Sequence, residues 1–244
     1  LQLYTRVDSG INSLADLKGK RVAHTSPTSN SGNLAPRALL PGQGIVPEQD
    51  YEVVYSGSHD QSMLGVVAGD YDAAFVDLWG CMHNGLTAFP DAVKAMQDYR
   101  GVGGRVILVT NAPRPWTSVQ KQIQGMGIPD DCWDAIATSG DSARAAMFAG
   151  AVGKKVWFMG EDHDQSFFKP MELLSDQVEI AQVPLDEADG IVCCGPADPH
   201  ADPAVYRPQF LAAKQRGLKL LCANPDIVVD RGESREWCAG ALAK

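Results

Sequence analysis

Two positions in the chain carry groups that could transfer a phosphoryl group. Asp77 follows the short apolar stretch AAFV, and Thr110 and Asn111 follow the apolar stretch VILV. At the ends of adjacent parallel strands, a carboxylate could attack phosphorus while a hydroxyl binds the transferring group. This arrangement predicts a phosphoryl site. Taken alone, an Asp at the end of a strand is more often a cap than a nucleophile.

A second polar group lies near the start of the chain. SPTSNSGNLAPRALL places Ser29, Asn30 and Ser31 just ahead of a helical run, and His59 stands in SGSHD. A helix N-terminus offers N–H donors and a positive dipole end, which suits a phosphate or phosphonate. The alternative for the serine-rich turn is ordinary helix capping. An isolated histidine in the position of His59 is more often a surface or capping residue.

The elements that must position these residues follow from the hydrophobic pattern. Short β-branched apolar runs alternate with amphipathic stretches along the whole chain. Strands are expected at 1–7, 20–24, 51–56, 72–77, 104–110, 154–160, 177–183, 190–195 and 218–223, and helical stretches at 59–69, 90–100, 116–127, 141–150 and 204–217. This alternation predicts an α/β fold with mainly parallel, Rossmann-like sheets and ligands at the carboxyl ends of the strands.

The first part of the chain resembles a family of binding proteins. The stretch from DSGINSLADLKGKRVAH to SGSHDQSMLGVVAGDYDAAFVD resembles one lobe of the phosphonate- or phosphite-binding components of ABC importers. The resemblance implies that Ser29, Asn30, Ser31 and His59 face a ligand, with Asn30 where that family usually has Thr. It also implies a periplasmic protein that binds its ligand between two lobes.

The rest of the chain resembles a family of enzymes. VDLWGCMHNG, VTNAPRP and CANPDIVV resemble motifs of the haloacid dehalogenase (HAD) superfamily, in the nitrophenyl-phosphatase and sugar-phosphatase subclass with a large α/β cap. The resemblance implies phosphate monoester hydrolysis through an aspartyl-phosphate on Asp77. Thr110 and Asn111 would then contact the phosphoryl group, and Mg²⁺ would be bound by the Asp77 side chain and the Trp79 carbonyl.

Two differences from the enzyme family predict a reduced or absent activity. The usual motif is Asp-x-Asp, and its second Asp acts as acid and base, but here that position is Trp79. The family also continues into a Gly-Lys-Pro segment and an acidic motif, which do not lie within these 244 residues. The expectation is an incomplete site. His83 is the nearest group that could replace the missing acid, although a loop histidine is more often structural.

The resemblance extends to two further polar segments of this chain. Ser139, Gly140 and Asp141 resemble a cap loop that faces the substrate, and could equally form a helix N-cap. Asn224 and Asp226 could lie near the entrance of the site or could form a turn.

The expected domains follow from both resemblances. They are a binding-lobe-like segment at 1–75, the first part of a HAD-like core at 76–126, an α/β cap at 127–217 and a return to the core at 218–244. The main hypothesis is a HAD-like phosphatase, and the alternative is a phosphate- or phosphonate-binding component of an ABC transporter. A third possibility is an accidental fusion with neither activity.

Composition limits the partners and the compartment. The formal charge of −9 and the lack of a Lys/Arg cluster argue against nucleic acid. No apolar run reaches the roughly 20 residues of a membrane span. The expected partner is a small phosphorylated or phosphonate ligand, and a homodimer is left open. Six cysteines without a metal-binding spacing favour the cytoplasm.

Overall fold

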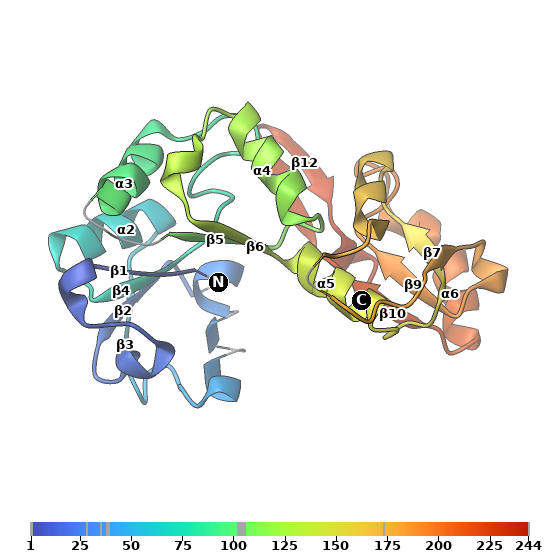
Figure 1. Ribbon diagram of the computed structural model, residues 1–244, viewed down its shortest axis with the longest axis horizontal. Helices are drawn as coiled ribbons and strands as arrows, with labels where there is room; N and C mark the ends of the chain where they lie inside the picture. The colour runs from blue at the N-terminus through green and yellow to red at the C-terminus, as the bar shows by residue number, and fades with distance from the viewer. Residues whose placement is uncertain are drawn as a thin grey trace. The chain divides into compact units, whose positions relative to one another are not determined.

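The alternating pattern folds into an α/β structure with mainly parallel sheets, which confirms the predicted fold class (Figure 1). The computed structural model describes residues 2–27, 29–34, 36–37, 40–101, 106–172 and 174–243. Within the predicted strands, residues 1 and 104–105 lie outside the described residues. The chain divides into two compact units: unit 1 comprises Leu1–Thr110 and Ile123–Ile136, and unit 2 comprises Asn111–Gln122 and Ala137–Lys244. The predicted domain boundaries stay a prediction.

Unit 1 is built on a four-stranded sheet with the order β1-β4-β2-β3. The strands are β1 (Gln2–Thr5), β2 (Arg21–His24), β3 (Glu52–Tyr55) and β4 (Ala73–Val76). β4 is parallel to β2 and antiparallel to β1, so strands from the first 24 residues pair with both of its edges.

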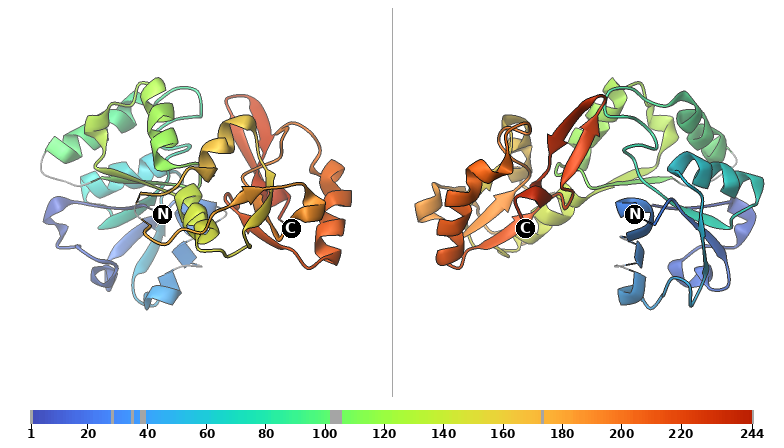
Figure 2. Two further views of the ribbon diagram at one scale, coloured as in Figure 1. Left: turned by 45° about the vertical axis from the view of Figure 1, so that its right-hand side comes forward. Right: turned by 180° about the vertical axis from the view of Figure 1, so that it is seen from behind.

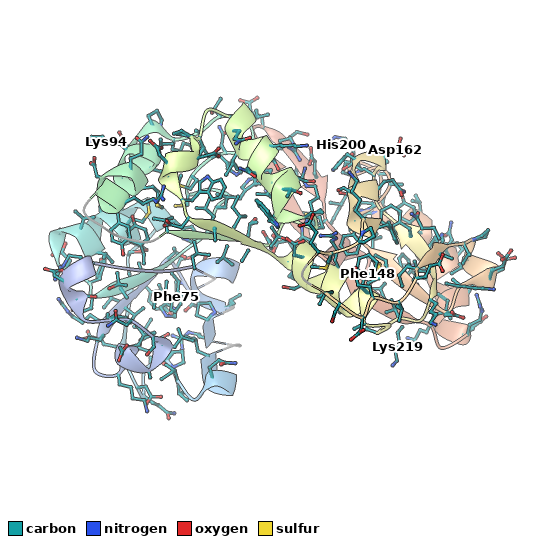
Figure 3. The ribbon with its side chains drawn as sticks, in the orientation of Figure 1. Phe75, Lys94, Phe148, Asp162, His200 and Lys219 are labelled. Atoms are coloured by element: carbon teal, nitrogen blue, oxygen red, sulfur yellow. The ribbon has the colours of Figure 1, made fainter. Side chains whose placement is uncertain are left out.

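The helices of unit 1 begin and end at recognisable signals. Helix α2 (His59–Ala68) connects β3 to β4; the Ser58 side chain caps its N-terminus, and Gly69, with φ of 87°, ends it. Helix α3 (Pro90–Gly101) begins at a proline, and β5 (Ile107–Thr110) follows. Phe75 of β4 and Val22 of β2 belong to one buried core of unit 1, and Figure 3 labels Phe75.

Two elements begin in one unit and end in the other. Helix α4 (Trp116–Gly125) begins in unit 2 and ends in unit 1. Strand β6 (Ala135–Thr138) begins in unit 1, ends in unit 2 and pairs with β5. Short 3-10 turns, such as Asp130–Cys132, join the longer elements.

Unit 2 contains a fully parallel four-stranded sheet with the order β10-β9-β7-β8. The strands are β7 (Lys155–Met159), β8 (Ala181–Gln182), β9 (Gly190–Cys193) and β10 (Lys219–Cys222). β8 is much shorter than the strand expected at 177–183. It lies at the edge of the sheet and pairs only with the beginning of β7, at Lys155 and Val156, among the described residues.

Helices cover both faces of this sheet. Helix α5 (Ser139–Phe148) contributes Met147 and Phe148 to the core on one face, and α6 (Arg207–Gln215) contributes Ala213 to the core on the other. Figure 2 shows the hairpin of β11 (Val228–Arg231) and β12 (Ser234–Trp237), which the hydrophobic pattern did not predict. None of the described helices is long and apolar enough to cross a membrane.

Candidate functional site

Asp77 comes directly after β4, at the carboxyl end of that strand. Its side chain is partly exposed, and its Oδ1 accepts a hydrogen bond from the Leu78 N–H at 2.7 Å. The chain then turns sharply, with Gly80 at φ of 76° and its N–H donating to the His83 carbonyl at 2.8 Å. The carboxylate is therefore held at a strand end next to a tight loop, as the sequence predicts.

Trp79 and His83 pack together inside this loop. Their ring centroids lie 5.2 Å apart in an edge-to-face arrangement, and His83 is only 2% exposed. His83 Nδ1 accepts the Gly85 N–H at 3.0 Å, while a Cβ atom at Gly85 would lie 2.4 Å from the Trp79 ring. Trp79 has no group that exchanges protons near neutral pH, and the buried His83 is part of the loop structure.

Thr110 ends β5 and is 8% exposed, but its strand is not paired with β4. In the described pairings β4 lies between β1 and β2, and β5 pairs with β6. The expectation that the strands ending at Asp77 and Thr110 are direct neighbours is therefore wrong for this structure. The physical reason is that strands from residues 2–24 use both hydrogen-bonding edges of β4.

The magnesium site expected at Asp77 and Trp79 stays a prediction. No group of three or more His, Cys, Asp or Glu side chains among the described residues could hold a metal ion. The predicted ligands are the Asp77 carboxylate and the Trp79 backbone carbonyl, and Mg²⁺ is usually bound by one or two carboxylates together with waters and phosphate oxygens. Mg²⁺ is typical of HAD phosphatases, but none of the reaction steps proposed for this chain uses it.

Asn111 lies in unit 2, where it meets the loop that follows β10. Its Nδ2 donates to the Asp226 carboxylate and, at 3.4 Å, to Asn224 Oδ1. The Asp226 N–H donates to the same Asn224 oxygen at 3.0 Å. The structure thus brings together three residues that were singled out in two separate parts of the sequence.

The serine-rich turn follows β2 at the carboxyl edge of the unit 1 sheet. Ser29 Oγ accepts the Gly32 N–H at 3.1 Å, and the Ser29 carbonyl accepts the N–H groups of Asn33 and Leu34. Asn30 and Ser31 lie in the same turn (Asn30–Leu34), but their side chains lie outside the described structure.

His59 begins helix α2 after β3, the strand adjacent to β2. The Gly57 N–H donates to the Thr25 carbonyl at 2.7 Å, which connects the loops that follow β3 and β2. Ser29 and His59 are therefore carried by connected loops at the same edge of the sheet.

A buried network behind this turn was not found from the sequence. His24 is fully buried, its Nδ1 lies 2.9 Å from Asn33 Oδ1, and its Nε2 lies 2.9 Å from the Tyr51 hydroxyl. Arg37 Nε donates to the same Asn33 oxygen at 2.9 Å and also binds Tyr55 and Glu48. Burial lowers the pKa of His24, against the hydrogen bond to Asn33, which raises it. We call these six residues the His24 network. The only sequence signal was a histidine at the end of an apolar strand.

Two family models match this chain, and they overlap at residues 74–81. Residues 1–81 match the periplasmic phosphonate substrate-binding proteins of ABC transporters, and residues 74–173 match the haloacid dehalogenase-like hydrolases. The overlap contains Asp77 and all of β4 except its first residue.

Individual proteins give the same division. The phosphate-import protein PhnD of Mycolicibacterium smegmatis is 39% identical over 75 residues, 28% of this chain and 23% of PhnD. A haloacid dehalogenase-like hydrolase from Brucella suis 1330 is 38% identical with a TM-score of 0.62, covering 68% of this chain and 61% of that one. A p-nitrophenyl phosphatase from Archaeoglobus fulgidus is 19% identical with a TM-score of 0.48, covering 68% and 60%, a likeness too low to indicate activity.

This chain thus spans less than two thirds of each of these proteins. It combines a segment that matches the phosphonate-binding proteins of ABC transporters with a longer segment that resembles the HAD-like hydrolases.

Proposed function

We propose that this chain is a HAD-like phosphatase that hydrolyses phosphate monoesters slowly through an aspartyl-phosphate on Asp77. The observation that carries the proposal is Asp77 itself: a partly exposed carboxylate at the carboxyl end of β4, within the residues that match the hydrolase family. The 38% identity to the hydrolase from Brucella suis supports the same assignment.

The proposed reaction has two displacements at phosphorus. A carboxylate oxygen of Asp77 forms a bond to phosphorus, the ester P–O bond breaks, and the leaving alkoxide takes a proton from water. Water then attacks the aspartyl-phosphate, which releases inorganic phosphate and restores the carboxylate. Thr110 and Asn111 stay predicted contacts of the phosphoryl group. They take no part in either bond change.

Trp79 explains why the proposed rate is low. A positioned acid and base typically contributes about 10²- to 10⁴-fold to the rate, and an indole supplies neither. The proton must then come from water, so substrates with good leaving groups, such as aryl phosphates, are the ones expected to react.

Replacing Trp79 by Asp tests this account. Trp79→Asp is expected to raise kcat for an aryl phosphate by about 10²-fold, because it restores a carboxyl group at the acid and base position. Asp77→Asn is expected to abolish phosphate release. The measurement is steady-state release of inorganic phosphate, with and without added Mg²⁺.

Trp79→Phe is the matched control, since it keeps an aromatic ring against His83 and adds no carboxyl group. Equal rates for Asp77→Asn and the natural chain would eliminate Asp77 as the nucleophile. Equal rates for Trp79→Asp and Trp79→Phe would eliminate the explanation of the low rate.

The second candidate function is binding of phosphate or a phosphonate by unit 1. Its specific support is the pair of connected loops that carry Ser29 and His59 at one edge of the sheet, next to the N-terminus of α2. PhnD, the relative of this segment, is named as a phosphate-import protein. Proteins of this kind close two lobes on the ligand, so a single lobe is expected to bind weakly.

Calorimetry with inorganic phosphate and with methylphosphonate tests the binding function. We expect a saturable heat at millimolar ligand that is lost in Ser29→Ala, because this change removes a hydroxyl from the turn. Ser175→Ala, an exposed serine in unit 2, is the control. No heat from the natural chain at millimolar ligand would rule this function out.

A cytoplasmic location and a small phosphorylated ligand complete the proposal. The six cysteines are all free thiols, which persist in a reducing compartment. The binding function would instead imply the periplasm.

A further inference from the structure

Asn33 connects the serine-rich turn of unit 1 to the His24 network. Its side-chain Nδ2 donates to the Pro27 carbonyl at 2.8 Å, and its backbone N–H donates to the Ser29 carbonyl at 3.1 Å. Asn33 is only 2% exposed, so water competes little for these hydrogen bonds. The turn is therefore bound to Asn33 both at Ser29 and two residues before it.

The amide group of Asn33 has a single orientation. Its Oδ1 accepts from His24 Nδ1 and Arg37 Nε, each at 2.9 Å, and from the Tyr55 hydroxyl at 3.4 Å. An amide that turned over would bring its own N–H groups against these donors. With the oxygen held in this way, the amide nitrogen faces Pro27.

His24 matches this orientation of the amide. Burial lowers the pKa of His24, so its imidazole is neutral near pH 7 and has one N–H group. Since Asn33 Oδ1 is an acceptor, this hydrogen is on Nδ1, and Nε2 accepts from the Tyr51 hydroxyl at 2.9 Å. Hydrogen bonds therefore run from Tyr51 through His24 and Asn33 to the turn.

The turn also packs closely on the end of β2. The Thr25 N–H donates to the Gly32 carbonyl at 3.4 Å, and a side chain at Gly32 would overlap the Thr25 side chain. The Thr25 carbonyl accepts the Gly57 N–H from the loop that precedes α2. The conformation of the turn is thus set by the strand end below it and by Asn33.

We propose that His24 and Asn33 are positioning residues for anion binding, because they hold the serine-rich turn in the conformation in which Ser29 contacts a phosphate or phosphonate. The proposal rests on the binding function of unit 1. Neither side chain is assigned a contact with the ligand. Both act through the backbone at Pro27 and Ser29, and a loop that is already ordered loses less conformational entropy when the ligand binds.

Calorimetry with inorganic phosphate and hydrogen exchange on the full chain test the proposal together. Asn33→Ala is expected to raise the dissociation constant about tenfold, the effect of one lost buried hydrogen bond. The Leu34 amide, which donates to the Ser29 carbonyl, is expected to exchange about tenfold faster. Asn12→Ala, which changes an exposed asparagine of unit 1, is the matched control and should alter neither quantity.

Two substitutions of His24 separate positioning from general loss of stability. His24→Asn keeps an amide N–H near the position of Nδ1, whereas His24→Gln places its amide near Nε2 and removes this donor from Asn33. Both lose the imidazole ring. We expect His24→Asn to keep the dissociation constant for inorganic phosphate within about threefold of the natural value and His24→Gln to raise it about tenfold.

Each outcome decides the proposal. Equal dissociation constants for the two His24 variants would overturn the positioning role, and so would an unchanged constant in Asn33→Ala with faster Leu34 exchange. Unchanged exchange in Asn33→Ala would overturn the contact with the turn. If the natural chain gives no heat, the binding function fails and the positioning role fails with it. Faster Leu34 exchange in Asn33→Ala would then still show that Asn33 holds the turn.

Discussion

At the scale of single residues, unit 1 contains a fully buried histidine, His24. His24 is enclosed by Asn33, Tyr51 and Phe75, whose ring meets the imidazole edge-to-face at 5.5 Å. Arg37 and Glu48 form an ion pair at the outer side of the network. A charged imidazole would be poorly solvated in this position, so the folded chain keeps His24 neutral.

The stability of unit 1 should therefore decrease on acidification. Because burial lowers the pKa of His24 in the folded state, the unfolded chain binds the proton first as the pH falls below about 6.5. The free energy of unfolding is expected to be constant above this pH and to fall between it and the lower folded-state pKa. Denaturant titrations at a series of pH values measure this slope.

His24→Gln should remove the contribution of His24 to the pH dependence of the unfolding free energy. It should also lower that free energy by about 1–3 kcal/mol at pH 7, because buried hydrogen-bond partners are lost. The exposed His200→Gln is the control and should leave the slope as it is. A slope below pH 6.5 that persists in full in His24→Gln would contradict this role of His24.

At the scale of elements, β4 is the strand at which the two family matches overlap. Three of its four residues lie within both family matches, and it pairs with β1 and β2 of the binding-lobe segment. A strand has two hydrogen-bonding edges, so β5 cannot pair with β4 while both edges are used. The strand that carries Asp77 is thus part of the sheet of the first segment.

Phe75 on β4 should be a main source of stability for this sheet. It is 2% exposed within the core that contains Val22 and Leu17. Phe75→Ala is expected to lower the unfolding free energy of unit 1 by about 3–5 kcal/mol, and Phe75→Leu by about 1.5 kcal/mol or less. Calorimetric unfolding measures both changes.

Phe148→Ala serves as the counterpart in unit 2, where Phe148 belongs to the α5 side of the core. This change should lower the unfolding free energy of unit 2 and leave that of unit 1 unchanged. Equal effects of the two Ala variants on every transition would mean that the units unfold as one.

The sequence predicted the positions of the strands better than the pairing between them. The apolar runs located β2, β3, β4, β7, β9 and β10, because the side chains of a buried strand are apolar whatever strand lies beside it. They did not predict that β4 pairs with β1 and not with β5, since pairing is a choice between distant segments. Asp77 does follow a strand, as expected, whereas the contacts of Asn111 with Asn224 and Asp226 connect loops that no local pattern relates.

At the scale of the whole molecule, the boundary between the two resemblances does not coincide with a boundary between compact units. Unit 1 contains the binding-lobe segment together with residues up to Thr110. Tyr4 on β1 packs against Tyr99 of α3 with the rings tilted and their centroids 5.1 Å apart, and its hydroxyl lies 3.6 Å from Met96 Sδ. The two segments therefore share one buried interior.

Deleting residues 1–72 should unfold what remains of unit 1 and preserve unit 2. The deletion removes both strands that pair with β4 and the Tyr4 contacts with α3, whereas the cores of unit 2 are formed by residues 143–242. Hydrogen exchange should show protected amides in β7 and β9 and fast exchange in α3. Protection of α3 equal to that in the full chain would show that the segments fold independently.

The free cysteines provide a natural reporter of these events. Cys81 and Cys132 belong to unit 1 and Cys193, Cys194, Cys222 and Cys238 to unit 2, and all are buried except the partly exposed Cys222. Burial raises the pKa of Cys132 to about 11 and that of Cys238 to about 12, so these thiols react slowly until their surroundings open. Counting the thiols modified over time by mass spectrometry would therefore measure how fast each unit opens, without changing a residue.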